Sequence, residues 1–450
     1  MIRRFVLAVL TISVSACMSV AAAPSPPTSS LDELAVRYVK LTLKIGERED
    51  GYVDAYYGPP EWAVEAKRLC AQPVANPSDS PCDLGKLRHE VMELVVDLAA
   101  QAAANATSGK PLNLEYEQRA RFLSAQLTAA NTRLRMMQGE KLSFEDEAEG
   151  LFGVRPVLKP LTAYDPVLKK IEALVPGDGP LAARVDTFND RFIVPPDRLQ
   201  AVMDAAIAEC RKRTLAHISL PANERFTLEF VTGKSWSGYN WYKGDATSLI
   251  QVNTDLPVRL SRAVDLGCHE GYPGHHVLNM LLEERLSKGK GWVEFTVYPL
   301  YSPQSLIAEG SANYGIELAF PGDEKAAFEA KVLYPLAGLD PKDASRYAGL
   351  QEAQKALAGA RFTIASEYLS GRIDKETAIG LIQTFQLVSR KRAEQSLAFI
   401  AQYRSYVINY GLGLDMVRTY VEGAGPDQAA RWKAMEWVIS GPTLPSDLVR

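Results

Sequence analysis

The sequence has no long apolar run beyond its N-terminal segment. No later stretch of the 450 residues reaches the roughly 18 apolar residues that a membrane-spanning helix needs. Charge of one sign is also lacking, because 50 Lys and Arg residues are nearly balanced by 54 Asp and Glu residues. Without a basic stripe or an aromatic-interleaved basic cluster, nucleic acid is not an expected partner. Membrane contact is therefore expected only through the N-terminus.

The N-terminal segment predicts export. Residues 1–23 combine a basic start, a short apolar stretch and small residues near a cleavage point, as in a signal peptide. Residues 14–17 (VSAC) fit a lipobox, which would make a lipidated Cys17 the mature N-terminus, and cleavage after Ala23 is the alternative. Residues 24–30 would then form a tether. The prediction is a periplasmic protein that is lipid-anchored to the outer membrane through Cys17.

Cysteine is scarce, with five residues in the whole chain. In an oxidising compartment, a disulfide between Cys70 and Cys82 would staple the loop rich in Pro and Ser that they bracket, but the sequence leaves open whether they pair. Cys210 lies in an apolar helical pattern and is expected in the core. Cys268 is interpreted as a buried small apolar residue rather than a metal ligand, since one helical step turns it about 100° from the next residue, His269.

Histidine is equally scarce, yet three of the five histidines lie within residues 269–276 (HEGYPGHH). Neutral imidazole is the commonest protein ligand of zinc, and a neighbouring carboxylate such as Glu270 can act as the base that activates water. The window therefore predicts a metal centre. A kinked core helix without metal is the alternative, but burying three imidazoles and a carboxylate without partners would be costly.

The spacing of these histidines departs from the usual helical zinc motif. That motif places its second histidine four residues after the first, where this chain has Pro273. In an unbroken helix, His276 would return to within about 20° of His269. If Pro273 and Gly274 instead break the helix as a two-residue insertion, His275 becomes the ligand and His276 supports it. The sequence leaves both open, and the second reading is favoured.

Helical periodicity dominates the rest of the chain. Apolar residues recur at three- and four-residue steps over 31–45, 84–98 and 116–137, which predicts an N-terminal helical scaffold over 31–175. The tyrosine-rich turn 51–60 is interpreted as a packed surface loop in preference to a lining of the cleft. A linker near residue 177 then leads into a catalytic region over 176–450.

The helical pattern of apolar residues gives way to a strand-like pattern after a helix predicted over 196–213. Residues 226–231 and 248–253 have the pattern of strands and are separated by an aromatic, glycine-rich segment. The fold class that follows is mostly α, a large helical body with a deep cleft and a small antiparallel β-sheet beside the metal-binding helix. An edge strand of that sheet would bind the substrate backbone. A long helix is expected over 375–401.

Residues 263–278 resemble a bacterial family with an HExxPGHH signature, which is known as domain of unknown function 885 and regarded as metallopeptidase-like. Residues 309–314 (EGSANY) resemble its EGWALY segment, with Ser311 in place of Trp. Residues 251–254 are similar to its asparagine-containing strand, and residues 403–413 to its helix with Tyr and Gly. The resemblance covers about the last two-thirds of the chain and implies a gluzincin-like zinc site.

The resemblance implies Glu309 as the third metal ligand beside His269 and His275, with His276 as the alternative ligand. Asn313 or Glu317 shares the face of Glu309 and would orient a histidine ligand. Three tyrosines follow the long helix, and one of them is expected to donate a hydrogen bond to the oxyanion of the substrate. Of Tyr403, Tyr406 and Tyr410, Tyr410 is selected as this donor. Asn253 and Arg404 are predicted to bind the substrate.

These expectations define a zinc-dependent peptidase that binds one zinc ion and hydrolyses unfolded or short peptides, with Glu270 as the general base. Two alternatives remain from other classes. One is a noncatalytic lipoprotein that binds peptides around a structural metal. The other is a metal-dependent hydrolase of a non-peptide amide.

Overall fold

The structure is a computed structural model that describes residues 30–107 and 113–449. The predicted signal peptide, Cys17 and the tether up to residue 29 lie outside the described residues. The fold is mostly α-helical, as predicted, with two small sheets. Within the described ranges, no helix is long and apolar enough to cross a membrane.

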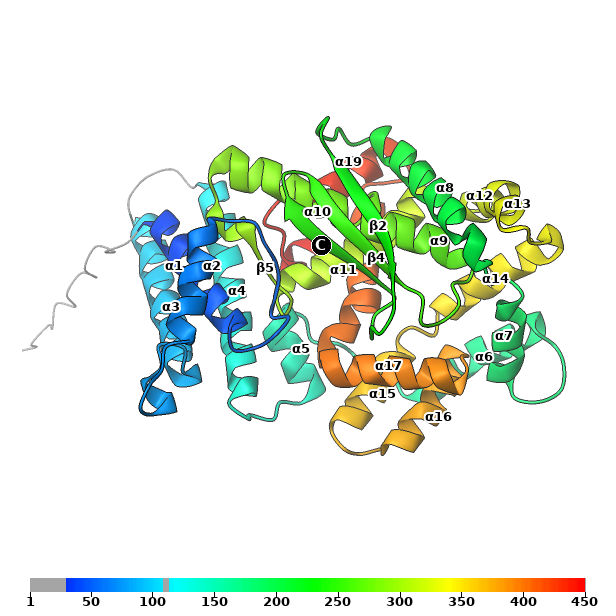
Figure 1. Cartoon of the computed structure of the whole chain (residues 1–450), viewed down its shortest axis with the longest axis horizontal. Helices are drawn as coiled ribbons and strands as arrows, with labels where there is room; N and C mark the ends of the chain where they lie inside the picture. Colours follow the sequence, from blue (N-terminus) through cyan, green and yellow to red (C-terminus); the bar gives the residue numbers. More distant parts are fainter. Residues whose placement is uncertain (1–29, 108–112, 450) are drawn as a thin grey trace, which may run out of the picture.

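The N-terminal helices pack together at one end of the molecule, drawn in blue and cyan (Figure 1). Helix α1 (Leu31–Gly46) begins with a capping box, in which Ser30 and Glu33 satisfy each other's backbone N–H groups. Its apolar stripe is buried, which confirms the helical prediction. The other helices of this group are α2 (Pro60–Cys70), α3 (Leu84–Thr107), α4 (Leu114–Met137) and α5 (Phe144–Phe152). A disulfide between Cys70 and Cys82, which the sequence left open, joins the end of α2 to the segment before α3.

Helices α6 (Asp165–Leu174), α7 (Leu181–Asp190) and α8 (Pro196–Leu215) follow on the opposite side of the molecule (Figure 1). Although α6 was assigned to the N-terminal scaffold, it packs against α14 (Ala344–Lys355) of the C-terminal part. Cys210 and Cys268 are both buried in the core, as expected. The sequence analysis did not predict that Cys210 of α8 forms a disulfide with Cys268.

The sheet beside the HEGYPGHH segment has three strands, in the order β2-β4-β3. Strand β2 (Arg225–Val231) pairs in parallel with β4 (Thr247–Asn253), whereas β3 (Gly238–Gly244) pairs with β4 antiparallel. The predicted all-antiparallel sheet is therefore mixed, and β3 lies in the segment that was read as a connection. Strand β4 is central, so the strand that carries Asn253 is not an edge strand.

The β3–β4 turn explains why β3 was missed. Asp245 and Ala246 have positive φ angles of 52° and 53°, a conformation that usually selects Asn or Gly. Here the turn is held from outside its own sequence, because the buried carboxylate of Glu283 accepts hydrogen bonds from the N–H groups of both residues. A second, two-stranded antiparallel sheet pairs β1 (Val53–Tyr56) with β5 (Val297–Pro299).

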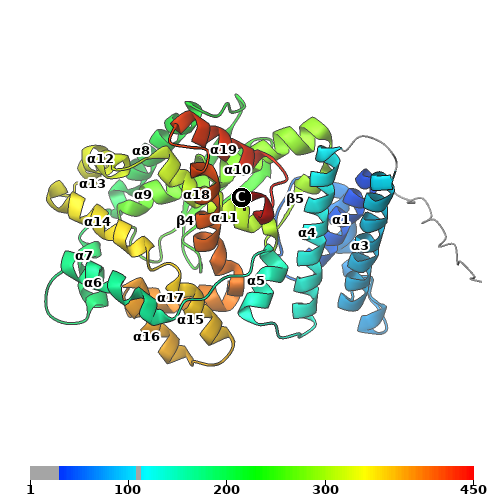
Figure 2. The same cartoon turned by 180° about the vertical axis from the view of Figure 1, so that it is seen from behind.

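Helix α11 (Pro303–Ala319) lies at the centre of the molecule. The sheet and α10 (His275–Leu282) lie on one side of it and α18 (Leu414–Glu422) and α19 (Gln428–Ser440) on the other (Figures 1 and 2). The long helix predicted over 375–401 is two helices, because Leu387 adopts a positive φ of 55° and ends the first of them. The remaining helices are α9 (Ser261–Leu266), α12 (Glu324–Phe328), α13 (Tyr334–Ala337), α15 (Ala360–Leu369), α16 (Lys375–Gln386) and α17 (Arg390–Tyr403).

Candidate metal centre

The HEGYPGHH segment contains a break between two helices. Helix α9 runs into a π-helical turn over Gly267–Gly271, and α10 starts at His275. Between them the chain folds back, so that the Gly274 N–H donates to the carbonyl of Cys268 at 3.0 Å. A Cβ atom at position 274 would lie 1.7 Å from the carbonyl oxygen of His269, so only glycine fits there. Pro273 and Gly274 thus interrupt the helix.

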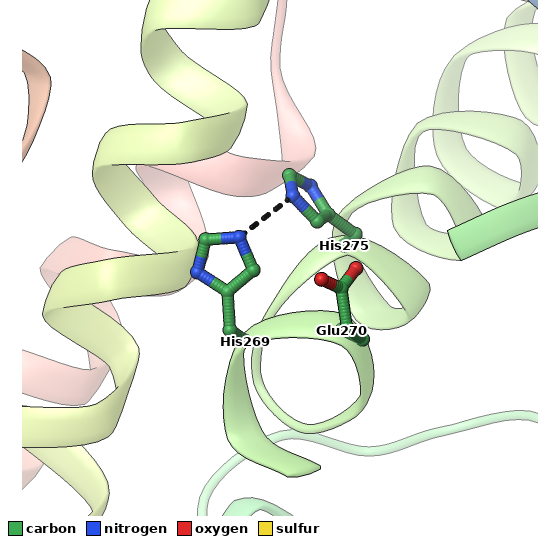
Figure 3. Close-up of side chains that lie close together, drawn as sticks. All are labelled: His269, Glu270 and His275. Carbon is green, nitrogen blue, oxygen red and sulfur yellow. Dashed lines mark hydrogen bonds between the residues drawn. The ribbon is translucent and has the colours of Figure 1, made fainter. Parts of the chain in front are cut away.

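This break brings three potential ligand atoms together. The Nε2 atoms of His269 and His275 lie 3.2 Å apart (Figure 3). The Oε2 atom of Glu309 lies 3.2 Å from the first nitrogen and 3.7 Å from the second. Ligands bound tetrahedrally to zinc at about 2.0–2.1 Å are separated from each other by roughly 3.3 Å. The spacing of the three atoms therefore matches one face of a tetrahedral site.

The donor set also fits a cation electrostatically. Glu309 is buried, and its Oε2 has no partner besides the imidazoles of His269 and His275. Burial by itself raises the pKa of Glu309, but hydrogen bonds and positive charge from His269 and His275 hold it well below its usual range. A buried carboxylate is costly unless positive charge compensates it, and a cation between the three side chains would do so. The residues present therefore suit a metal ion.

His269, one of the candidate ligands, is oriented from α11. The Nδ1 atom of His269 lies 3.2 Å from the Oδ1 atom of Asn313, a hydrogen bond in which the imidazole donates and which leaves Nε2 with its lone pair. The amide of Asn313 donates in turn to the carbonyl of Tyr410. Of the two candidates for this role, Asn313 is the one that contacts a ligand. Glu317 instead pairs with Arg418.

In metal-free protein the electrostatics of His275 favour a proton. Burial lowers the pKa of His275, but its hydrogen bond to Glu309 and the negative charges of Glu309, Glu270 and Asp54 raise it to about 9. The same negative charges would favour a cation in place of that proton.

Glu270 lies beside the two imidazoles, with its carboxylate directed toward the space between them (Figure 3). Burial raises the pKa of Glu270, and the charge of Glu309 adds to this rise against the opposing effect of the histidines. The backbone of β3 lies close to the Glu270 carboxylate. A Cβ atom added at Gly238 would lie 2.7 Å from Oε1 of Glu270. A buried carboxyl group with a raised pKa is suited to accept and return a proton.

His276 occupies a different environment. It is fully buried, its Nδ1 lies 2.8 Å from the Ser248 hydroxyl, and its Nε2 lies 3.3 Å from the carboxylate of Glu224. Both ring nitrogens are therefore engaged between α10 and the sheet. The structure places His275, and not His276, beside His269 and Glu309.

The three tyrosines predicted near the site all border the same cavity. The Tyr406 hydroxyl donates to Oε1 of Glu309 at 2.7 Å, which commits it to a ligand. The ring of Tyr410 is stacked beside that of His269, with centroids 6.4 Å apart. Burial, together with the charge of Glu309, raises the pKa of Tyr410 well above its usual value, so its hydroxyl keeps its proton. Tyr410 is thus the better placed hydrogen-bond donor.

Two residues that were predicted to bind substrate have partners within the protein. The Asn253 amide donates to the carbonyls of Lys234 and Trp236, and so holds the segment that leads into β3. Arg404 donates to the carboxylate of Glu147 at 2.7 Å. Neither side chain borders the cavity. The sequence could not reveal Glu147 as a partner, since it precedes Arg404 by 257 residues.

Asp54 is a cavity residue that the sequence analysis did not select. It lies on β1, within the turn that was interpreted as a surface loop, and one of its carboxylate oxygens is buried without a hydrogen bond. Burial raises the pKa of Asp54 to about 7, and the charges of Glu309 and Glu270 add to this, while His275 opposes it. The only signal in the sequence was an acid set among tyrosines and glycines.

The cavity in front of these residues has a volume of about 1610 Å³. It extends from the metal centre past Trp236–Asn240, where β3 begins, to α14 and α17. Pockets for small ligands are usually about 300–1,000 Å³. The cavity is therefore large enough for an extended chain of several residues.

Comparison with known proteins shows the fold alone. No protein-family model and no curated protein matches the sequence. A crystal structure of "the putative lipoprotein" from Colwellia psychrerythraea is similar, with 14% identity and a TM-score of 0.50, over 88% of this chain and 79% of that chain. A "putative lipoprotein of unknown function" from Shewanella oneidensis aligns at 13% identity over 90% of this chain and 82% of that one, with a TM-score of 0.45.

Proposed function

We propose that the protein is a zinc-dependent peptidase that hydrolyses unfolded or short peptides. The observation that carries the proposal is the convergence of His269, His275 and Glu309 on one point, with Glu270 beside them at the wall of a large cavity. Two imidazoles and one carboxylate form the ligand set of helical zinc peptidases, and a further carboxylate beside them acts as the base. The resemblance of residues 263–278 to a metallopeptidase-like family supports the same reading.

His269, His275 and Glu309 would hold the metal. When bound, zinc supplies Lewis-acid activation of water and of the scissile carbonyl. Glu270 accepts the proton of the attacking water and then returns it to the leaving amine, a task that its raised pKa favours. Tyr410 keeps its proton and donates a hydrogen bond to the negative charge that develops on the carbonyl oxygen. Asn313 fixes the ring of His269 throughout.

The substrate would lie along β3. This strand pairs only with β4 in its sheet, and its first residues border the cavity beside Glu270. An extended peptide can add to such an edge by main-chain hydrogen bonds, which are independent of sequence. Folded proteins cannot present a free strand inside a cavity of this size. The substrate class is therefore a short or unfolded peptide.

The proposed location is the periplasmic face of the outer membrane, with the chain anchored through a lipidated Cys17. The support comes from the lipobox at residues 14–17 and from two disulfides, which require an oxidising compartment. The similar protein from Colwellia psychrerythraea also carries the word lipoprotein in its name.

The test combines metal analysis with a peptide-library digest of the purified mature protein. We expect about one zinc per chain, cleavage that stops on chelation and returns with zinc, and loss of zinc in His269→Ala. Full zinc occupancy in that variant would refute the site. Peptide binding without cleavage would favour the noncatalytic lipoprotein, and cleavage of non-peptide amides alone would favour the other hydrolase.

A further inference from the structure

Arg361 is a cavity residue that the mechanism does not use. It lies in the first turn of α15 and borders both the large cavity and a smaller adjoining cavity of about 240 Å³. Its Nε is buried without a hydrogen-bond partner, and no carboxylate of residues 30–107 or 113–449 forms an ion pair with its guanidinium. Burial lowers the pKa of Arg361 from its usual value, and the interaction with the Tyr410 hydroxyl group opposes this only in part.

The other buried arginines of the described chain are paired with acids. Arg119 binds Glu294, Arg133 binds Glu49 and Arg259 binds Asp186. A buried guanidinium loses hydration, and a paired carboxylate compensates for that loss. Arg361 rests instead on an aromatic ring, with its Cζ 5.1 Å from the centroid of Phe399. That contact leaves its hydrogen-bond donors free.

A second free donor lies at the same junction of the two cavities. The Nε2 of Gln386, at the end of α16, is buried without a partner, while its Oε1 accepts a hydrogen bond from Ser396. Gln386 borders both cavities, as Arg361 and Tyr410 do. A guanidinium and an amide N–H with no acceptor in the protein form a site for an anion with planar oxygen acceptors.

Two aromatic rings, those of Phe399 and Tyr410, connect this site to the metal centre. The Phe399 ring contacts both the guanidinium of Arg361 and the ring of Tyr410, and the latter is stacked beside His269. A peptide with its scissile bond at the metal would therefore place a nearby group within reach of Arg361. The acid that this arginine lacks in the protein would then come from the substrate.

We propose that Arg361 and Gln386 bind a carboxylate of the peptide substrate and so make the enzyme selective for peptides with that charge near the scissile bond. The carboxylate is either the C-terminal one, which would define a carboxypeptidase-like mode, or an acidic side chain. The inference rests on the proposed peptidase function, because it assigns specificity to the same cavity.

The test measures peptide affinity by calorimetry with zinc-loaded Glu270→Gln protein, which should bind without turnover. Four probes separate the two sources: pentaalanine as free acid and as amide, and an amidated pentapeptide with central Glu or Gln. We expect one of the two acidic probes, either pentaalanine as the free acid or the Glu peptide, to bind about 10- to 100-fold more tightly than its neutral counterpart, as charge-assisted hydrogen bonds allow. Adding Arg361→Gln should abolish that difference, and Arg361→Lys should retain part of it.

Arg392→Gln is the matched control, because Arg392 also borders the cavity but donates to the carbonyl of Pro257. It should leave the acid-to-neutral ratio unchanged. Equal affinity for acids and neutral peptides in the parent protein, or an equal loss for all four probes in Arg361→Gln, would overturn the inference and leave the peptidase proposal standing. If no probe binds and the library digest shows no cleavage, both proposals fail.

Discussion

Substitution of the two adjacent histidines should separate metal binding from folding. The Nε2 of His275 lies 3.2 Å from that of His269 and 3.7 Å from Oε2 of Glu309, so its polar neighbours are the other candidate metal ligands. His276 is fully buried and bridges Ser248 and Glu224. We therefore expect His275→Ala to weaken zinc binding and His276→Ala to weaken the fold.

The magnitudes follow from the roles of the two rings. A four-ligand zinc site binds with about 10–16 kcal/mol, so that one ligand carries about 2.5–4 kcal/mol. Loss of His275 should then raise the dissociation constant for zinc by roughly 100- to 1000-fold. Loss of His276 leaves the buried Ser248 hydroxyl without its partner and removes one of the partners of Glu224, which should cost about 1–3 kcal/mol of unfolding free energy. Its effect on zinc affinity should stay within about tenfold.

Competition with a fluorescent zinc chelator gives the affinities, and urea unfolding of the metal-free proteins gives the stabilities. Metal-free His275→Ala should also lose stability at neutral pH, because the raised pKa of His275 means that its protonated ring stabilises the buried carboxylates around it, so zinc affinity is the measurement that separates the two variants. If His276→Ala instead loses zinc while His275→Ala retains it, the helix break does not place His275 at the metal, and the assignment is wrong.

The remaining predictions concern the surroundings of the site. Gly238→Ala should lower kcat at unchanged zinc content, because the new Cβ would displace the Glu270 carboxylate; unaltered kcat would contradict the close contact. Cys210→Ser should weaken zinc binding and lower stability by about 2–4 kcal/mol, since the disulfide anchors the residue before His269. Zinc binding at pH 6–8 should release close to one proton and strengthen about tenfold per pH unit, because the pKa of His275 is raised to about 9; a flat profile in calorimetry would refute this. Cys17→Ser should release the protein from the membrane fraction, and a soluble parent protein that begins at Pro24 would exclude the anchor.

Sequence patterns predicted those parts of the structure that depend on interactions between residues close together in the chain. The periodicity of residues 31–45 predicted α1 because its apolar stripe is also its buried face. Pro273 and Gly274 predicted the interruption of the metal helix, since one lacks an N–H and the other leaves room for a carbonyl oxygen. The resemblance of EGSANY to a family motif supplied Glu309, for which spacing alone offered several candidates.

Features fixed by distant residues could not be predicted in this way. Strand β3 ends in a turn that Glu283 holds, so its own residues carry no strong turn signal. The pairing of Cys210 with Cys268 depends on how α8 crosses the metal helix. Asp54 reaches the cavity only because β1 pairs with β5, more than 240 residues later. Each of these follows from tertiary packing, which overrides local preference.

The most direct test of the peptidase proposal is the turnover of Glu270→Gln on a peptide that the parent protein cleaves. The amide keeps the size of the side chain but cannot accept a proton at neutral pH. We expect about one zinc per chain, unchanged peptide affinity, and a kcat that falls about 10²- to 10⁴-fold, as for loss of a general base. Turnover at the parent rate, with zinc and peptide bound, would contradict the account.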